Sequence, residues 1–503
     1  MKYRSTRGGV SNLSFVEAVM MGLAPDKGLL VPERVPKVDA ATLEKWKTLE
    51  FHELAVEIMS LYISRDEIGL DDLKTMAKEA YSTFRSKDVT PVVDLSKAMR
   101  SSSGGGASAS PPPNKVYLLE LFHGPTFAFK DVALQFLGRL FEFILREKKE
   151  PLTILGATSG DTGSSAIQGV RGRANVECFI LYPENRTSKI QEAQMATVAD
   201  PNVHAVALRE AEFDDCQKIV KALFADASFR ADVKLGAVNS INWARILAQI
   251  TYYFYATFKL LEEEKNEENI WFSVPTGNFG DVLAGYYAKE MGLPSCGGLI
   301  VATNDNDILC KFFQSGVYAR PEAGATPTLA PSMDICVSSN FERFLYHCGG
   351  NDPSKCAALM ADFERTGRFQ ADGPTFDAAK SHMVSGSVDE DALLDTIRRW
   401  HDTTGYVLDP HTAVGVCAGL RLRPDDNATL VCLACAHHAK FPGAVEKAIG
   451  KNAIDALTPE TALTDLLHLP LRNAVVTNDL DAVKDFILTT LAERRGGPAG
   501  EKQ

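Results

Sequence analysis

The chain has 503 residues, of which 45% are hydrophobic and 23% charged, so it can form two to four ordinary globular domains with buried pockets. Its formal net charge of −12 argues against nucleic acid or an anionic membrane as a partner, although a local basic pocket for a small anion stays compatible with it. Ten scattered cysteines, no apolar run of membrane-spanning length and no apolar leader segment predict a cytoplasmic protein with ordinary buried thiols.

The first hundred residues show helical patterns. Ser14 followed by Glu17 forms a capping box, and Gly22 marks the end of that helix. Further helices are predicted over residues 41–63 and 70–84. We therefore expect a mainly helical domain over residues 1–100, followed at 101–114 by the flexible linker "SSSGGGASASPPPN".

Short apolar strands followed by glycine-rich turns and helices dominate the rest of the chain. This alternation predicts an α/β fold with parallel-rich sheets, in which ligands bind at the carboxyl ends of the strands. The expected parts are a large α/β domain over residues 115–150 and 236–490, a small α/β domain over 151–235, and a disordered tail over 491–503. The strands are expected in the segments "KVYLLELF", "PLTILGA", "ECFILYPEN", "ENIWFSVP", "GGLIVATN" and "ATLVCLAC".

Three turns carry the residues that point to chemistry. In "WFSVPTGNFGDVLAGYY" a strand ends at Pro275 and a helix opens near Asp281, so backbone N–H groups and a helix N-terminus converge as in a phosphate cradle. A plain tight turn is the alternative. The turn in "LGATSGDTGSSAIQG" lacks the lysine of a nucleotide-phosphate loop, but its amides and hydroxyls suit a carboxylate or a second phosphate. In "AVNSINWARILAQI", Arg245 would lie in the first turn of a helix, as a clamp for a dianion or as an ordinary surface charge.

Lys130 stands at the end of the apolar stretch "FHGPTFAFKD", where a helix is predicted to begin. It could extend its amine to solvent from the helix end, or it could be a buried amine with a chemical function. One lysine together with two or three anion cradles suits pyridoxal 5'-phosphate, which needs a lysine amine, a phosphate socket and a carboxylate site for an amino-acid substrate.

Several long strings, in the same order along the chain, resemble the long-chain threonine synthases, which belong to the tryptophan-synthase-like group of pyridoxal-phosphate enzymes (fold type II). The matching strings are "YRSTRG", "SFVEAVMMGLAPDKGLLVP", "LELFHGPTFAFKDVALQFLG", "ATSGDTGSSA", "NSINWAR", "PTGNFGD", "SMDICVSSNFERFL", "DPHTAVG" and "AHHAKFP". The resemblance implies the conversion of O-phospho-L-homoserine and water to L-threonine and phosphate.

The resemblance also implies roles for individual residues. Lys130 matches the lysine that binds the cofactor covalently and moves protons during catalysis. The cofactor phosphate would be held by the loop of Gly277, Asn278, Phe279, Gly280 and Asp281. The substrate carboxylate would be received by Thr158, Ser159, Gly160, Asp161 and Thr162, and the substrate phosphate by Asn239, Ser240 and Arg245.

The chain departs from the family pattern in "LVCLACAHHAKFP". Cys435 stands where relatives have a threonine or serine against the pyridine nitrogen, and His438 stands where they have a proline. A thiol is a weaker hydrogen-bonding group than a hydroxyl, but we expect catalysis to survive the exchange. The nearby Cys432 and His437 raise a metal site as an alternative, which the strand pattern and the lack of a second ligand pair disfavour, so no metal is predicted. For His123, the sequence leaves two interpretations open: it lines the site, or it is an ordinary structural histidine.

Two other functions remain open at this point. A related lyase would eliminate phosphate and release 2-oxobutanoate, and a non-catalytic pyridoxal-phosphate-binding protein would show no turnover. The expected partners are a small-molecule substrate and, at most, a second copy of the chain, so the protein is predicted to be a monomer or a homodimer.

Overall fold

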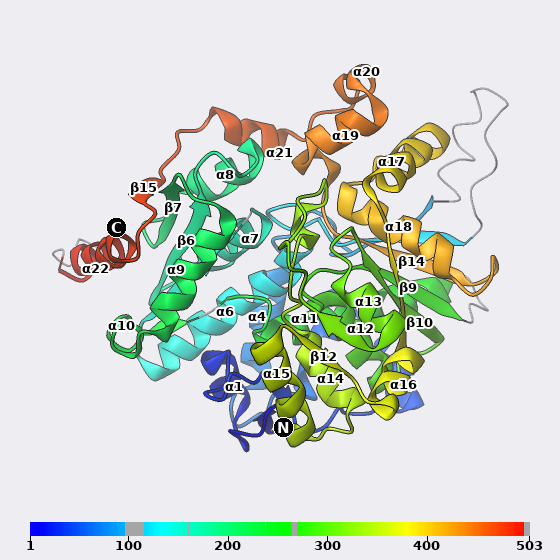
Figure 1. Ribbon diagram of the computed structural model, residues 1–503, viewed down its shortest axis with the longest axis horizontal. Coiled ribbons are helices and arrows are strands. Elements are labelled where there is room, and N and C mark those ends of the chain that lie inside the picture. Colours follow the sequence, from blue (N-terminus) through cyan, green and yellow to red (C-terminus); the bar gives the residue numbers. More distant parts are fainter. Residues whose placement is uncertain (96–114, 159, 237, 264–268, 497–503) are drawn as a thin grey trace. The chain divides into compact units, whose positions relative to one another are not determined.

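The computed structural model describes residues 1–95, 115–158, 160–236, 238–263 and 269–496 (Figure 1). Its contacts divide the chain into two compact units. The first unit comprises Met1–Phe136 and Ser240–Pro459, and the second comprises Leu137–Asn239 and Glu460–Gln503. The expected linker at 101–114 lies outside the described residues.

These boundaries differ from those expected from the sequence. The N-terminal hundred residues belong to the first unit, because helix α3 (Phe51–Ser60) packs against α11 (Trp243–Glu263) and strand β3 (Val92–Asp94) pairs with the main sheet. The boundary on the other side falls within helix α6 (Lys130–Lys148). Sequence composition separates these segments, whereas their buried apolar contacts join them.

The N-terminal helices follow the predicted signals. Ser14 and Glu17 form the capping box of α1 (Phe15–Met21), and Gly22 ends that helix. The helix predicted over 41–63 is instead two helices, α2 (Ala40–Trp46) and α3, because Glu50 and Glu53 form a second capping box that starts a new helix. The helix α4 (Leu70–Tyr81) confirms the third prediction.

The first unit contains a six-stranded sheet with the order β13-β10-β9-β14-β4-β3. All neighbouring pairs are parallel except β3 with β4, so five strands end at the same edge. The strands of the first unit are β1 (Tyr3–Ser5), β2 (Leu30–Pro32), β3, β4 (Val116–Glu120), β9 (Ile270–Pro275), β10 (Cys296–Thr303), β11 (Val317–Ala319), β12 (Arg368–Gln370), β13 (Met383–Ser387) and β14 (Thr429–Ala434). Its remaining helices are α12 (Gly280–Met291), α13 (Ile308–Ser315), α14 (Phe341–Cys348), α15 (Pro353–Thr366), α16 (Gly373–His382), α17 (Glu390–Thr404), α18 (Pro410–Leu422), α19 (Pro442–Ile449) and α20 (Lys451–Asp455).

Both faces of this sheet are covered by helices, as successive residues of β9 demonstrate. The Phe272 ring lies 5.1 Å from the ring of Tyr253 on α11, whereas the Ser273 hydroxyl donates to the carbonyl of Gly415 on α18 at 2.5 Å. Neighbouring side chains of a strand point to opposite faces, so α11 and α18 cover opposite faces of the sheet. This confirms the expected α/β architecture with buried parallel strands.

The second unit contains a parallel five-stranded sheet with the order β15-β7-β6-β5-β8. Its elements are β5 (Leu152–Ala157), α7 (Asp161–Val170), β6 (Val176–Pro183), α8 (Lys189–Ala196), β7 (Val203–Arg209), α9 (Phe213–Ala225), α10 (Ala227–Val233), β8 (Leu235–Gly236), α21 (Thr461–Thr464), β15 (Ala474–Thr477) and α22 (Leu480–Gly496). The C-terminal segment joins this unit because β15 extends the sheet and α22 packs on α9. Residues 491–496, which the sequence assigned to a disordered tail, form the end of α22.

Among the described residues, no helix is long and apolar enough to cross a membrane. All ten cysteines are free thiols, and seven of them are buried. No group of three or more histidine, cysteine or acidic side chains is arranged to hold a metal ion in the described part of the chain.

Candidate active site

Three segments meet at the carboxyl edge of the first unit's sheet. Strands β4, β14 and β9 are parallel neighbours, and they lead into Lys130, Cys435 and the 277–281 loop respectively. Ligands bind at this edge in open α/β sheets. The sheet topology therefore gathers three groups of predicted cofactor residues that lie far apart in the sequence.

Lys130 is held by the strand-end segment that contains Cys435. The backbone N–H of Phe129 donates to the carbonyl of Cys435 at 2.7 Å, and Ala128 forms an isolated bridge with Ala436. Lys130 opens helix α6 and is only 8% exposed, with Nζ 4.7 Å from the centre of the Phe129 ring. A buried amine favours the second of the two roles that the sequence left open for this lysine.

The turn before Lys130 is fixed by the residue that follows it. The Asp131 carboxylate accepts hydrogen bonds from the Thr126 backbone N–H at 2.7 Å and from the Thr126 hydroxyl at 2.8 Å. Both residues are buried. A Cβ at Gly124 would lie 2.4 Å from the Cβ of Asp131, so the close approach requires glycine there.

The 277–281 loop has the geometry of an anion cradle. Phe279 adopts a left-handed conformation with φ of 61°, and helix α12 begins at the next residue. Its N-terminal N–H groups and positive dipole end favour a phosphate at this point. A Cβ at Gly277 would lie 3.0 Å from the carbonyl oxygen of Ser332, so a side chain there would press against the neighbouring 332–335 segment and displace the loop. The Phe279 ring anchors the loop against Phe341 and Phe344 of α14, with centroids 5.2 and 5.4 Å away.

Asp281 is buried at the start of α12. Its Oδ1 accepts from the hydroxyls of Tyr252 and Tyr253, and its Oδ2 has no hydrogen-bond partner among the described residues. Burial raises the pKa of Asp281 to about 6, while the two tyrosine hydroxyls and the charge of Lys130 act to lower it. A buried carboxylate within the field of the lysine amine is a suitable partner for a group that gains and loses protons.

Cys435 is buried, and its backbone N–H and carbonyl are both hydrogen-bonded. Its Sγ lies 3.8 Å from the carbonyl oxygen of Leu433, and its backbone N–H donates to the Thr412 hydroxyl at 3.1 Å. The same hydroxyl donates to the Asp409 carboxylate. Thr412 on α18 therefore holds the backbone of Cys435 in place independently of the Cys435 side chain.

The residues predicted for the substrate phosphate divide between the units. Ser240 and Arg245 belong to the first unit, whereas Asn239 is exposed and belongs to the second. Arg245 is 4% exposed, and burial lowers its pKa to about 10, so the guanidinium stays charged at neutral pH. A buried cation of this kind is a strong attractor of a dianion.

The 158–162 loop lies in the second unit, between β5 and α7. The Thr158 hydroxyl oxygen accepts from the N–H groups of Gly160 and Gly163, both at 2.9 Å, so this buried threonine shapes the loop from inside. Asp161 is also buried, and its Oδ1 accepts from Nε2 of Gln191 at 2.9 Å. Thr162 is half-buried at the start of α7, and Ser159 lies outside the described residues.

His123 pairs with an acidic neighbour. Its Nε2 lies 2.8 Å from Oε2 of Glu120, and the hydroxyl of Tyr406 donates to the other carboxylate oxygen at 2.6 Å. These contacts tie His123, which lies three residues beyond the end of β4, to the last residue of that strand.

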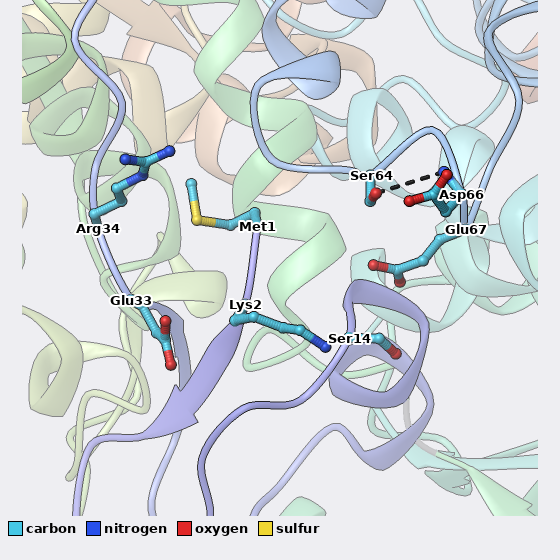
Figure 2. A pocket seen from close by; sticks show the side chains of 8 residues that line it. All are labelled: Met1, Lys2, Ser14, Glu33, Arg34, Ser64, Asp66 and Glu67. Carbon is cyan, nitrogen blue, oxygen red and sulfur yellow. Dashed lines mark hydrogen bonds between the residues drawn. The ribbon is translucent and has the colours of Figure 1, made fainter.

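Two cavities lie elsewhere in the first unit, and neither contains a predicted site residue. One of about 610 Å³ is lined mostly by residues with polar or charged side chains (Figure 2). Another of about 450 Å³ lies between the segment after β2 and the carboxyl ends of α12, α14 and α16. The first is lined by Met1, Lys2, Ser14, Glu33, Arg34, Ser64, Asp66 and Glu67.

Comparison with known proteins identifies the family. Residues 2–81 match "Threonine synthase N terminus", residues 106–436 match "Pyridoxal-phosphate dependent enzyme", and residues 412–487 match "Threonine synthase, C-terminal". The chain is 46% identical to the threonine synthase of Saccharomyces cerevisiae, with 98% of each chain covered, and 42% identical to that of Pseudomonas aeruginosa, with 97% and 98% covered. The chain belongs to the threonine synthase family.

Solved structures agree with this assignment. The yeast threonine synthase superposes with a TM-score of 0.89 at 43% identity, covering 98% of this chain and 99% of that one. The PLP-bound threonine synthase from Brucella melitensis gives a TM-score of 0.88 at 40% identity, covering 97% and 99%. The fold is therefore that of a fold type II pyridoxal-phosphate enzyme, as expected, and pyridoxal 5'-phosphate is the family's cofactor.

The residues present fit that cofactor. A buried lysine amine suits the cofactor's aldehyde, and a helix N-terminus preceded by a glycine turn suits its phosphate. The buried Asp281 carboxylate, whose pKa is raised by burial and lowered by the charge of Lys130, suits a site that holds a protonated nitrogen. The serines and the asparagine of "SMDICVSSNFERFL" carry no local signal of a role. Tyr252 and Tyr253 lie in an apolar helical pattern, which hides the hydroxyls that contact Asp281.

Proposed function

We propose that this chain converts O-phospho-L-homoserine and water to L-threonine and phosphate. The observation that carries the proposal is the convergence of Lys130, the 277–281 loop and Cys435 at the ends of three neighbouring parallel strands, in a chain of the threonine synthase family. When bound, pyridoxal phosphate supplies an electron-accepting ring that acidifies the carbon positions next to the substrate's amino group.

Lys130 is the proposed proton carrier. Its Nζ takes a proton from Cα of the substrate and returns protons to the carbon skeleton later in the reaction. The cofactor contacts proposed for the loop are those of Gly277, Asn278, Phe279, Gly280 and Asp281, with Cys435 beside the ring. Asp281 stabilises the protonated amine through its charge, which is supported by the effect of Lys130 on the pKa of that carboxyl.

The substrate's two anionic groups need separate sites. Ser240 and Arg245, with Asn239, are proposed for the phosphate, and Thr162 with the backbone of the 158–162 loop for the carboxylate. The buried charge of Arg245 supports the first assignment, and the position of the loop at a helix N-terminus supports the second. Thr158, Gly160 and Asp161 shape this loop, and Ser159 belongs to it.

The overall bond changes balance without another reactant. The Cγ–O bond breaks and phosphate leaves, one C–H bond of Cβ breaks, and the oxygen of water bonds to Cβ. The three protons released from Cα, from Cβ and from water are returned to Cα, to Cγ and to the phosphate. Exclusion of bulk water until phosphate has left would prevent early hydrolysis.

The test is incubation of the cofactor-loaded protein with O-phospho-L-homoserine, with phosphate and organic products measured together. Equal amounts of threonine and phosphate are expected. Phosphate with 2-oxobutanoate would instead identify the related lyase. If neither threonine nor phosphate formed, the protein would be a cofactor-binding protein without turnover.

We also propose a cytoplasmic monomer or homodimer whose function involves neither nucleic acid nor membranes. Ten free thiols support a reducing compartment, and the acidic net charge disfavours polyanionic partners. Light scattering during size exclusion measures the oligomeric state directly, and a mass above two chains would contradict the proposal.

A further inference from the structure

The 338–343 segment lies between the two predicted anion sites of the first unit. It comprises Ser338, Ser339, Asn340, Phe341, Glu342 and Arg343 and runs into helix α14. Ser338 donates from its hydroxyl to the carbonyl of Gly277 at 2.7 Å, and the Ser339 hydroxyl donates to Oδ1 of Asn278 at 3.1 Å. The segment therefore contacts the loop proposed for the cofactor phosphate at two neighbouring residues.

Asn340 joins that loop to the loop proposed for the substrate phosphate. Its Nδ2 donates to the carbonyl of Asn278 at 3.0 Å and to the carbonyl of Ser240 at 3.1 Å. Its backbone N–H also donates to the carbonyl of Asn278, at 3.1 Å. Asn340 is fully buried, so both amide hydrogens are committed to the two loops without competition from water.

The orientation of the Asn340 amide is set by Arg343. Nη1 of Arg343 donates to Oδ1 of Asn340 at 2.5 Å, which leaves Nδ2 facing the two loops. A flipped amide would turn its NH2 group toward the guanidinium, where two donors would oppose each other. Arg343 thus specifies which end of the amide faces the loops.

Arg343 is itself fixed by backbone carbonyls from separate segments. Its Nε and Nη2 donate to the carbonyl of Leu30 on β2 at 3.0 and 2.9 Å, and Nη2 donates to the carbonyl of Ile241 at 2.7 Å. The guanidinium is fully buried near the ring of Trp243. Arg343 therefore connects the N-terminal strand β2 to the segment that follows Ser240.

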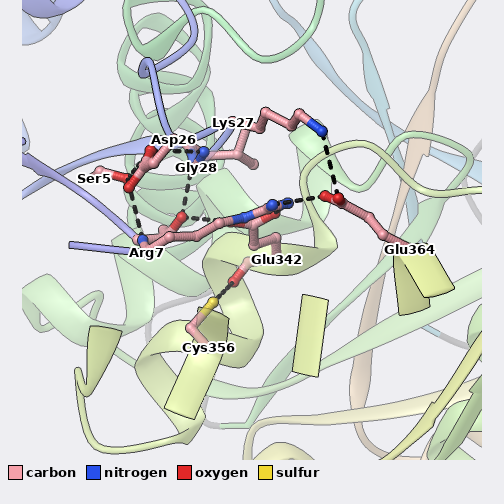
Figure 3. A network of polar contacts seen from close by, with 10 residues as sticks. Ser5, Arg7, Asp26, Lys27, Gly28, Glu342, Cys356 and Glu364 are labelled. Carbon is pink, nitrogen blue, oxygen red and sulfur yellow. Dashed lines mark hydrogen bonds and ion pairs between the residues drawn. The ribbon is translucent and has the colours of Figure 1, made fainter. Parts of the chain in front are cut away.

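The neighbouring Glu342 strengthens this connection to the N-terminus. Figure 3 shows the Arg7 guanidinium between Glu342 and Glu364, with ion-pair distances of 2.9 and 2.7 Å. The Thr6 hydroxyl also donates to Glu342, at 2.6 Å. These partly buried contacts hold the start of the chain against the beginning of α14 and the end of α15.

We propose that Asn340, oriented by Arg343, is a positioning residue that fixes the spacing between the cofactor-phosphate loop and the substrate-phosphate loop. The inference rests on the proposed function for the identity of the two anions, but the hydrogen bonds that carry it are independent of that function. Since each loop must hold its own phosphate at a fixed distance from the reacting carbons, a small displacement of one loop impairs both binding and alignment.

The deciding variant is Asn340→Asp, which keeps the shape and the acceptor for Arg343 but replaces both donated hydrogen bonds with a carboxylate oxygen facing two carbonyls. We expect the KM for O-phospho-L-homoserine and the Kd for pyridoxal phosphate each to rise about tenfold or more, because each lost buried hydrogen bond costs about 1–3 kcal/mol. The Kd comes from titrating the apoprotein and following the visible absorbance of the lysine-bound cofactor.

The matched control is Asn202→Asp in the second unit. Asn202 is a buried amide whose Nδ2 donates to the carbonyls of Val170 and Val176, both at 3.0 Å. This variant removes an equivalent pair of hydrogen bonds, so thermal stability is expected to fall without a change in KM or cofactor Kd. Equal changes in Asn340→Asp and Asn202→Asp would reduce Asn340 to a structural residue and overturn the proposal.

A milder variant covers the case in which Asn340→Asp fails to fold. Ser339→Ala removes the hydroxyl that lies 2.9 Å from the Ser240 hydroxyl and 3.1 Å from Oδ1 of Asn278. About a threefold rise in both constants is expected, since one partly exposed hydrogen bond contributes about 0.5–1.5 kcal/mol. Unchanged constants would refute the positioning role, whereas failure of the wild-type protein to make threonine would refute only the proposed function, because the cofactor titration is still measurable.

Discussion

The 277–281 and 158–162 loops have the same local plan, in which a parallel strand ends, a glycine turn follows and a helix begins, yet they are supported differently. The 277–281 loop is held from outside by side chains from distant segments, including Ser338, Asn340 and the tyrosines around Asp281. The 158–162 loop is held by its own Thr158 hydroxyl and by a single side chain of its own unit, Gln191 on α8. A loop that depends on many segments stays fixed only when the whole unit is folded, whereas a self-supported loop keeps its shape if its unit moves. Under the proposed function, this difference suits a rigid cofactor site in the first unit and a preformed substrate loop in the second.

The largest expected effect comes from removing the amine of Lys130, which lies in the first unit. Lys130→Ala should lower turnover about a thousandfold or more, because proton transfer from Cα loses its carrier. The visible absorbance of the lysine-bound cofactor should disappear while circular dichroism stays unchanged. A borohydride-reducible adduct that persisted in the variant would place the cofactor on another lysine.

A substitution at Gly160 should disturb the conformation of the 158–162 loop. The φ of 150° at Gly160 disfavours any side chain, and a Cβ would lie 2.4 Å from Cδ of Gln191. Gly160→Ala should raise the KM for O-phospho-L-homoserine about tenfold, since backbone strain of about 1–3 kcal/mol would displace the loop. Cofactor Kd should stay unchanged, because the first unit's loop is separately supported.

The control for Gly160→Ala separates the collision from the backbone strain. Gln191→Ala removes the colliding side chain together with its hydrogen bond to Asp161. The double variant Gly160→Ala/Gln191→Ala differs from Gln191→Ala only by the backbone strain at position 160. If the double variant matched Gln191→Ala in KM, the collision and not the backbone conformation would account for the effect.

The contacts that hold the 277–281 loop make the free energy of unfolding depend on pH through Asp281. The pKa of Asp281 is about 6 in the folded protein, against an ordinary value of 3.8. Between pH 3.8 and pH 6 the carboxyl is therefore protonated in the folded state but ionised in the unfolded state. The free energy of unfolding therefore falls as pH rises through this window, by about 1–3 kcal/mol, and the penalty is complete above it. Asp281→Asn should remove this slope, as measured by urea denaturation across the pH range.

A second variant tests the cause of that slope. Tyr253→Phe removes a hydroxyl that donates to Asp281 Oδ1 at 3.0 Å, so the carboxyl's pKa should rise further and the sloping region should extend to higher pH. An unchanged pH profile in both variants would show that Asp281 does not titrate in this range.

The smallest effect is expected at Cys435. Cys435→Thr introduces, at similar volume, the residue type that the family resemblance implies at this position, and the backbone here is already fixed by Thr412 and Phe129. Turnover should change by less than about threefold, because the exchange alters one weak hydrogen bond to the cofactor ring. A hundredfold loss would mean that the thiol does more than replace a hydroxyl.

The sequence alone indicated the chemistry because its local signals coincide with the site. The glycine turns, the capping box at Ser14 and the apolar strands followed from periodicity and backbone preferences, and the structure confirms the strands β4, β5, β6, β9, β10 and β14. Lys130 was conspicuous because it directly follows an apolar stretch. The motif strings then indicated the family, which the comparisons confirm.

Tertiary structure decided what depends on contacts between distant segments. The edge strand β13 lies in a stretch without recognisable motifs, and its pairing with β10 follows from the sheet and not from its own residues. The C-terminal segment extends the second unit's sheet, and β3 joins the N-terminal residues to the first. Periodicity reports which face of an element is buried, but it does not report the element that covers it. The role of Asn340 is of this kind, since a buried asparagine acquires a function only from the two loops and the arginine that surround it.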